Sequence, residues 1–413
     1  MGESQYSKLN SKFCKQKSLS GIYFHIPFCK KACHYCNFHF STSLSKKDDM
    51  IDAIIQEVRL SAFQADQKDE HAGSFSSTPG GDSGIATVYF GGGTPSLLTG
   101  NELKRMMQAL YENFQVWGDA EVTMEANPDD ISAKNLEEWK SAGVNRLSIG
   151  VQSFINHELQ WMNRVHDAAQ SLQCIHLVQE AGFDNFSVDM IYGTPGLSVS
   201  DWEKNITSLI GLQIPHISCY ALTVEPGTAL KKMITLKKRA DVDPEQQRTQ
   251  FLLMTDWLEL AGYEHYEISN FARPGLRSKH NSGYWQGKHY RGFGPSAHSF
   301  DGQTRKWNIS NNEFYMKSIK AGFVPSEHEV LTNIQQLNEY IMTSIRTLEG
   351  TDLEYIAGKF GTEKSERLAQ SINRFKNNGN VQAQDSKIIL TREGKLFADG
   401  IAADLFFDEL PVP

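Results

Sequence analysis

The sequence predicts an α/β fold in which a parallel sheet is covered by helices, followed by a small helical domain. Short β-rich runs alternate with helical patterns six times between residues 20 and 262. Such alternation is typical of parallel sheets with helices outside. An aromatic- and Gly-rich segment, 263–312, shows little periodicity, and helical patterns return over 313–413. A chain of 413 residues is long enough for two or three such units.

Each element of the α/β part is predicted from its own pattern. The strands are predicted at Ile22–Ile26, Ala86–Phe90, Val122–Glu125, Arg146–Gly150, Phe186–Ile191 and His216–Leu222. The helices are predicted at Asp48–Leu60, Asn101–Asn113, Ala133–Ala142, Asp167–Ala181, Asp201–Leu212 and Glu245–Ala261. Apolar residues at i, i+3 and i+4 positions define the buried faces of these helices. Periodicity alone does not tell whether the sheet closes into a barrel.

The remaining segments have weaker signals. Residues 1–19 form a polar tail, and the Gly-, Ser- and Asp-rich stretch 64–84 is predicted as a surface insertion. The C-terminal part predicts helices around 337–345, 353–360 and 368–375. A strand at 388–390, a turn at 392–394 and a final helix at 396–403 follow. We expect a compact, winged-helix-like domain with a small hairpin.

Composition restricts the class of protein. The chain is 40 % hydrophobic and 22 % charged, with a net charge of −8. This acidic balance argues against a nucleic-acid surface, which normally has a basic excess. The first twenty residues contain no apolar core of a secretory signal, and no run of roughly eighteen apolar residues occurs. We therefore expect a cytoplasmic protein.

Cys29, Cys33 and Cys36 form the pattern C-x3-C-x2-C directly after the first predicted strand. Three thiolates do not complete a structural zinc site, which takes four protein ligands. They suit an iron–sulfur cluster in which one iron lacks a protein ligand, because clusters are usually held by four thiolates. Three unrelated buried thiols are one alternative. Another is zinc with a fourth ligand from the nearby histidines His25, His34 or His39.

Small and polar residues follow the predicted strands, where the functional residues of α/β barrels gather. A glycine triplet, Gly91–Gly93, lets the backbone approach a ligand closely. Carboxylates at the strand ends suit an ammonium group and ribose hydroxyls, and a nearby arginine suits a carboxylate. Together they indicate S-adenosylmethionine, whose amino and carboxylate groups can occupy the open iron. The residues in question are Glu125, Gln152, Arg164, Asp189 and Ala221.

These motifs resemble, in order, those of the radical S-adenosylmethionine proteins, and more closely the coproporphyrinogen-III-oxidase-like branch. The resemblance covers about residues 20–300 and continues more faintly through the C-terminal domain. The matching motifs are Y-F-H-I-P-F-C from Tyr23, G-G-G-T-P-S from Gly91, E-A-N-P from Glu125, R-L-S-I-G-V-Q-S from Arg146, R-V-H from Arg164, D-M-I-Y-G-T-P from Asp189 and E-P-G-T from Glu225.

The resemblance implies an incomplete (β/α)6-type barrel followed by the small C-terminal domain. It implies that Cys29, Cys33 and Cys36 hold a [4Fe–4S] cluster. It also implies contacts with S-adenosylmethionine, some at the site of a second molecule, for Tyr23, Gly92, Gly93, Thr94, Glu125, Gln152, Arg164, Asp189 and Ala221.

This branch contains oxidases that decarboxylate coproporphyrinogen III through a 5′-deoxyadenosyl radical, and haem chaperones that share the barrel. Three departures favour the chaperones. Phe38 stands where the oxidases have a fourth cysteine, and only 28 residues precede Cys29, whereas the oxidases have a longer arm. The run from His280 to Trp285 resembles the H-N-x-x-Y-W motif associated with haem binding.

A neutral imidazole is a common axial ligand of haem iron, and aromatic rings can cover a porphyrin face. The resemblance therefore implies haem contacts for His280, Asn281, Tyr284 and Trp285. The alternative is a hydrogen-bonded core or loop histidine against which the two aromatic residues pack.

The sequence thus predicts a haem chaperone carrying a cluster and S-adenosylmethionine, with coproporphyrinogen III oxidase as the alternative. We hypothesise that cluster and cofactor hold or switch the haem site through assembly of a homodimer. Haem would then pass to soluble or membrane-bound haemoproteins.

Overall fold

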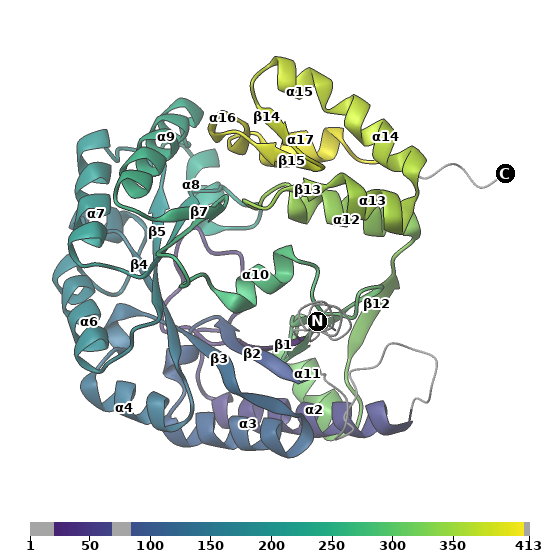
Figure 1. Ribbon diagram of the computed structural model, residues 1–413. Helices are drawn as coiled ribbons and strands as arrows, with labels where there is room; N and C mark the ends of the chain where they lie inside the picture. Colours follow the sequence, from purple (N-terminus) through teal and green to yellow (C-terminus); the bar gives the residue numbers. More distant parts are fainter. Residues whose placement is uncertain (1–19, 68–83, 409–413) are drawn as a thin grey trace, which may run out of the picture.

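Six parallel strands form the centre of the fold in the computed structural model, which describes residues 20–67 and 84–408 (Figure 1). They are β1 (Ser20–Ile26), β2 (Ile85–Gly92), β3 (Val116–Ala126), β4 (Arg146–Gln152), β5 (Phe186–Tyr192) and β6 (His216–Ala221), and they lie side by side in chain order. All six predicted strands are confirmed, with Leu222 falling one residue beyond β6. The predicted tail 1–19 and residues 68–83 of the predicted insertion lie outside the described residues.

Further strands extend the sheet at both edges, so the barrel is incomplete, as the resemblance implies. β9 (Tyr290–Phe293) lies next to β1 and is parallel to it. Beyond β9 follow the antiparallel strands β10 (His298–Phe300), β11 (Thr304–Asn308) and β12 (Ser326–Val330). Next to β6 lie the antiparallel strands β8 (Asn270–Ala272) and β7 (Glu264–Glu267). No periodic signal predicted these short edge strands.

Helices cover the convex face of the sheet (Figure 1). The long ones are α2 (Lys47–Gln67), α3 (Gly100–Asn113), α4 (Ala133–Ser141), α6 (Ala168–Glu180), α7 (Val199–Gly211) and α9 (Pro244–Leu260), which confirms the six predicted helices. Shorter ones are η1 (Pro95–Leu97), η2 (Pro128–Asp130), α5 (Asn156–Trp161) and α8 (Ala229–Thr235). A reciprocal capping box between Thr99 and Glu102 fixes the start of α3. No helix in the described ranges combines the length and apolarity that crossing a bilayer requires.

The buried carboxylate of Glu57 connects α2, on the convex face of the sheet, to the strands added beyond β1. Glu57 accepts hydrogen bonds from the Gly294 N–H at 2.7 Å, the Asn308 side-chain amide at 2.7 Å and the Tyr315 hydroxyl at 2.5 Å. Tyr315 lies on α11 (Asn312–Lys320). Burial raises the pKa of Glu57, and the three donors oppose that shift. Because an unpaired buried carboxylate is costly, this network specifies the position of the β9–β11 extension.

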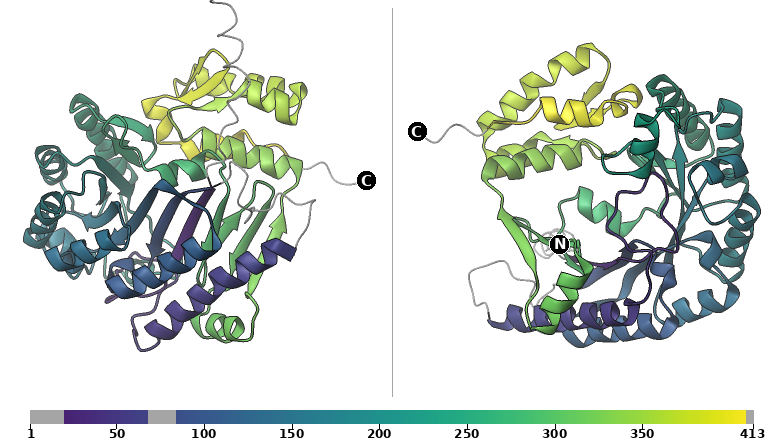
Figure 2. Two further views of the ribbon diagram at one scale, coloured as in Figure 1. Left: turned by 60° about the horizontal axis from the view of Figure 1, so that its bottom comes forward. Right: turned by 180° about the vertical axis from the view of Figure 1, so that it is seen from behind.

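One short helix, α10 (Lys279–Trp285), lies on the concave side of the sheet, opposite the outer helices (Figures 1 and 2). Its first turn is anchored to the interior of the sheet by Glu121 on β3. The carboxylate of Glu121 accepts hydrogen bonds from the backbone N–H groups of Lys279 at 3.0 Å and His280 at 3.1 Å. The concave face is therefore filled by residues far away in the sequence.

The C-terminal region has its own hydrophobic core, which begins at Leu337. It contains α12 (Asn333–Ser344), α13 (Leu353–Phe360), α14 (Thr362–Ser371), α15 (Asn373–Asn377), α16 (Arg392–Lys395), α17 (Ala398–Asp404) and the three-stranded sheet of β13 (Thr351–Asp352), β15 (Lys387–Leu390) and β14 (Val381–Gln384). Residues 313–330, predicted as the start of this domain, contribute most of α11 and all of β12, and Tyr315 and Ile319 belong to the main core. The predicted helix 368–375 is divided between α14 and α15, and the predicted turn at 392–394 is part of α16.

Candidate cluster and cofactor site

The loop that carries the three cysteines is held from both sides by backbone hydrogen bonds. The Cys29 N–H donates to the Ser41 carbonyl at 3.0 Å, and the His34 N–H donates to the Met162 carbonyl at 3.3 Å. Cys29 is buried, whereas Cys33 and Cys36 are half-buried. The loop is thus a fixed part of the barrel rim and exposes two of its three sulfurs.

Donors lie beside two of these sulfurs. The Thr94 hydroxyl donates to the Cys29 Sγ at 3.4 Å, and the Arg164 guanidinium donates to the Cys33 Sγ at 3.3 Å. Hydrogen-bond donors and a cation favour the thiolate form that binds metal. Burial acts in the opposite direction and raises the pKa of the Cys29 thiol to about 11, so an iron atom has to displace its proton.

The two kinds of metal site place different demands on the three sulfurs. In the described part of the chain, no three His, Cys, Asp or Glu side chains are placed to hold one metal ion together. A structural zinc ion takes four ligands around a single centre. In a cubic cluster each thiolate binds a different iron, so the three sulfurs do not have to converge on one ion.

A cavity of about 440 Å³ lies beside the cysteine loop at the carboxyl ends of the parallel strands. It brings together the three cysteines and all but one of the residues predicted to contact S-adenosylmethionine. Those that line it are Gly92, Gly93, Thr94, Glu125, Gln152, Arg164, Asp189 and Ala221. Tyr23 is not among the lining residues, and its ring stacks on Tyr89 with 6.1 Å between ring centroids.

Two carboxylates at this cavity lie in largely buried surroundings. Glu125 accepts hydrogen bonds from the Tyr89 hydroxyl at 2.9 Å and the Gly92 N–H at 3.2 Å. Burial raises the pKa of Glu125 to about 7, and the nearby Asp189 acts in the same direction. Burial likewise raises the pKa of Asp189 to about 6, although the hydroxyls of Ser218 and Ser148 oppose it. An ammonium group would stabilise the ionised form of either carboxylate.

Arg164 is the cation of this cavity. Its guanidinium donates to the Asn127 side-chain oxygen at 2.7 Å and to the Gly150 carbonyl at 2.8 Å, in addition to Cys33. Its Nε is buried and has no partner within the described chain. A buried, unsatisfied donor of this kind indicates an absent ligand atom or water. A carboxylate-bearing ligand therefore fits the donor set that is present.

The glycine triplet leaves no room for side chains beside the cysteine loop. A Cβ at Gly93 would come within 2.5 Å of the Phe28 carbonyl oxygen, and a Cβ at Gly91 would come within 2.9 Å of the rings of Tyr23 and Tyr89. Gln152, which also lines the cavity, has a φ of 68°, a strained conformation for a residue with a side chain. Such strain is concentrated at functional sites.

The sequence did not single out several residues that complete this site. Ser148 bonds to Asp189, Asn127 orients Arg164, and Tyr89 orients Glu125. Tyr89 and Ser148 follow the alternation of their strands, which points every second side chain inward, and Asn127 stands directly after β3. Tyr89 lies two residues before Gly91, and Ser148 lies two residues before Gly150. The alternation of inward-facing side chains along each strand could therefore have predicted both residues.

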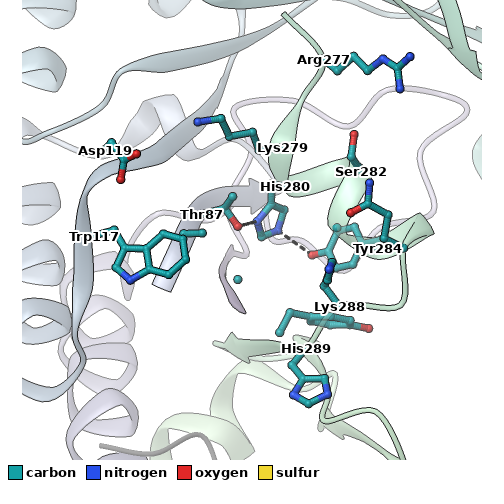
Figure 3. A pocket seen from close by; sticks show the side chains of 15 residues that line it. Thr87, Trp117, Asp119, Arg277, Lys279, His280, Ser282, Tyr284, Lys288 and His289 are labelled. Carbon is teal, nitrogen blue, oxygen red and sulfur yellow. Dashed lines mark hydrogen bonds between the residues drawn. The ribbon is translucent and has the colours of Figure 1, made fainter. Parts of the chain in front are cut away.

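The residues of the H-N-x-x-Y-W run lie elsewhere. His280 and Tyr284 line a second cavity of about 380 Å³ on the concave side, near the amino ends of β1, β2 and β3 (Figure 3). Figure 3 shows His280 hydrogen-bonded on both sides, with Nδ1 2.7 Å from the Thr87 hydroxyl and Nε2 2.9 Å from the Tyr284 hydroxyl. Burial lowers the pKa of His280 to about 3, so the ring is neutral at ordinary pH.

The other two residues predicted to contact haem do not line this cavity. Asn281 and Trp285 are absent from its lining residues. The Arg346 guanidinium of the C-terminal region lies over the Trp285 ring, 5.2 Å from its centroid. Trp285 therefore helps to join α10 to the C-terminal domain. In this structure both ring nitrogens of His280 are hydrogen-bonded to side chains of the protein.

Comparison with known proteins agrees with this architecture. The model of the radical SAM superfamily matches residues 23–209, and the HemN C-terminal domain matches residues 331–397. The chain is 32 % identical to the heme chaperone HemW of Bacillus subtilis over 387 residues, which are 93 % of this chain and 98 % of that protein. The chain belongs to the HemW family of radical S-adenosylmethionine proteins.

A second relative and one solved structure are also similar to the chain. The heme chaperone HemW of Mycobacterium tuberculosis is 31 % identical over 93 % of this chain and 94 % of its own length. The structure of the coproporphyrinogen III oxidase HemN of Escherichia coli superimposes with a TM-score of 0.78, covering 98 % of this chain and 94 % of that one, at 22 % identity. The latter similarity concerns the fold alone. Membership of the radical S-adenosylmethionine superfamily implies a [4Fe–4S] cluster and S-adenosylmethionine as cofactors.

Proposed function

We propose that this protein is a haem chaperone, which binds haem and passes it to haemoproteins. The observation that carries the proposal is the similarity to proteins named heme chaperone HemW over nearly the whole length of both chains. Phe38, which stands where the oxidases have a fourth cysteine, also supports the proposal. It is an exposed apolar side chain that lines the cavity beside the cysteines.

The cluster and S-adenosylmethionine belong, in this proposal, to the first cavity. Cys29, Cys33 and Cys36 would hold the cluster, which when bound supplies one-electron chemistry and an open iron. Glu125 and Arg164 would orient the ammonium and carboxylate groups of the cofactor. Support comes from the paired carboxylates, the unsatisfied Arg164 Nε and the absence of side chains along the glycine triplet.

Haem is assigned to the second cavity, around His280 and Tyr284. The pocket has the size of a small ligand site and combines aromatic walls with cationic side chains. Direct ligation of iron by the His280 Nε2 requires that the Tyr284 hydroxyl gives up its hydrogen bond. Asn281 and Trp285 would act on haem only through a movement of α10, because neither lines the cavity. We also propose that soluble or membrane-bound haemoproteins accept the haem and that the protein assembles as a homodimer.

The alternative function is the oxygen-independent oxidation of coproporphyrinogen III. One observation favours it: the cavity beside the cysteines contains a complete set of polar groups for S-adenosylmethionine, which a carrier of haem does not need for transport alone. An assay of coproporphyrinogen III oxidation tests this alternative.

The test uses the full chain purified without oxygen. We expect a brown protein with about four iron atoms per chain, haem binding in a spectroscopic titration, and transfer of haem to an apo-haemoprotein. Incubated with a reductant, S-adenosylmethionine and coproporphyrinogen III, it should produce no protoporphyrinogen. Formation of protoporphyrinogen together with absence of haem transfer would replace the chaperone by the oxidase.

A further inference from the structure

The second cavity has an excess of positively charged groups. Arg277, Lys279 and Lys288 line it, and Asp119 is its single lining carboxylate (Figure 3). His289 also lines it, but burial lowers the pKa of that imidazole, so it contributes no charge near neutral pH. This excess is unexpected in a chain with a net charge of −8.

Only two of the three cations are available to a ligand. Arg277 forms ion pairs with Glu264 at 3.3 Å and with Glu349 at 2.7 Å, so its charge is neutralised within the fold. Lys279 and Lys288 form no ion pair with any described residue. Both residues line the cavity, Lys279 as an exposed residue and Lys288 as a half-buried one. Figure 3 shows them on either side of the His280 ring.

The walls between these two lysines are aromatic. Tyr284 and Tyr290 meet edge to face with 4.6 Å between their ring centroids, and Trp117 lines the opposite side. These aromatic walls suit a flat, largely apolar ligand. The first cavity differs, because Glu125 and Asp189 would repel an anionic ligand there.

We propose that Lys279 and Lys288 recognise the two propionate carboxylates of haem, and that the second cavity therefore selects tetrapyrroles with free acid side chains. This inference rests on the proposed haem-binding function and adds to it the groups that determine specificity. Two separate ammonium groups match two carboxylates on a planar apolar ring. An ammonium–carboxylate contact at a pocket mouth is partly screened by water, so each contributes modestly to affinity.

The experiment compares haem with haem dimethyl ester, in which both carboxylates are blocked, by titration of the full chain. We expect the wild type to bind haem about tenfold more tightly than the ester. Lys279→Gln and Lys288→Gln should each weaken haem binding by roughly two- to fivefold, and the double variant by about tenfold. The affinity of the double variant for the ester should be unchanged.

Two control proteins keep the test interpretable. Lys134→Gln removes an exposed lysine on α4, whose side chain is 82 % exposed, and should change neither affinity. The double variant with arginine at both positions keeps the charges and should retain the preference for the free acid. Equal binding of haem and ester by the wild type, or an undiminished preference in K279Q/K288Q, would overturn the inference while leaving haem binding intact. A wild type that binds neither compound would instead contradict the proposed function.

Discussion

The cavity beside the cysteines and the cavity around His280 are connected through Tyr89 but differ in how their polar groups are satisfied. Tyr89 contacts one lining residue of each cavity: its hydroxyl donates to Glu125, and its ring stacks on His280 with 5.0 Å between centroids. On the cluster side, Glu125 and Asp189 are hydrogen-bonded to neutral donors, and the Arg164 Nε has no partner within the described chain. On the other side, both nitrogens of His280 are already bonded.

This difference shows what each cavity can do without rearrangement. Charged groups that line a cavity without a charged partner can bind a polar ligand without rearrangement, because the ligand replaces the hydration that burial removed. A histidine with two internal partners is prepared to support the fold, and ligation of iron requires an exchange of partners. The available charges of the second cavity are those of Lys279 and Lys288.

The largest effect should come from the cysteine loop. Replacement of Cys29, Cys33 or Cys36 by serine is expected to reduce the iron content from about four atoms per chain to nearly none, because each thiolate holds its own iron. Iron analysis and the visible spectrum provide the measurement. Cys174→Ala is the matched control, since Cys174 is a buried thiol on α6 and should leave the iron content unchanged. Retention of a full cluster after any one of the three changes would contradict the ligand assignment.

The carboxylate of Glu125 should rank next. Glu125→Gln removes the negative charge that would bind an ammonium group, and we expect affinity for S-adenosylmethionine to fall roughly ten- to hundredfold, or about 1.5–3 kcal/mol. Isothermal titration of the cluster-bound protein measures it. Glu327→Gln, an exposed change on β12, is the control. An unchanged affinity for the cofactor in Glu125→Gln would remove this residue from the site.

The same affinity should depend on pH. Because the pKa of Glu125 is raised to about 7, its carboxylate is ionised above that pH and protonated below it. Binding of S-adenosylmethionine should therefore weaken as the pH falls from about 8 to about 6. Asp189, with a pKa raised to about 6, adds to the loss at the acidic end, and Tyr23 and Tyr89 stay neutral throughout. A profile in Glu125→Gln as steep as that of the wild type near pH 7 would show that another group is responsible.

Gly93 offers a smaller steric test of the cluster side. Gly93→Ala would bring a methyl group against the Phe28 carbonyl, and we expect a loss of about 1–3 kcal/mol in unfolding free energy together with a weakened cluster. Denaturant unfolding and iron content measure the two effects. Gly118→Ala is the comparison, since nothing lies within 4 Å of a Cβ at that position. If both variants behave alike, the close contact at Gly93 has no energetic consequence.

The smallest effect should come from Tyr284. Tyr284→Phe removes the hydrogen bond to the His280 Nε2, which should cost about 1 kcal/mol of stability. If His280 ligates haem iron, the same change should accelerate haem binding, because the nitrogen no longer has to leave a partner. Stopped-flow mixing with haem, beside His280→Ala, tests this. Slower binding by Tyr284→Phe would indicate that the tyrosine itself contacts the ligand.

Local patterns were sufficient for the barrel and for the position of its functional edge. The six strands and six outer helices follow from alternation and 3.6-residue periodicity, since each depends on residues close together in the chain. The register of parallel strands then brought Gly92, Glu125, Gln152, Asp189 and Ala221 to one cavity. The edge strands β7–β12 are only three to five residues long, which is too short for a periodic signal in the sequence.

By itself, the sequence determined the three-cysteine loop, the glycine and carboxylate strand ends behind it and the family to which they belong. The tertiary structure alone decided that α10 enters the concave side, where Glu121 anchors it. It also placed His280 and Tyr284 at a cavity and Trp285 in a contact with the C-terminal domain. The physical reason is distance along the chain: Thr87, Glu121 and Arg346 lie far from α10 in sequence, and only the folded chain makes them its neighbours.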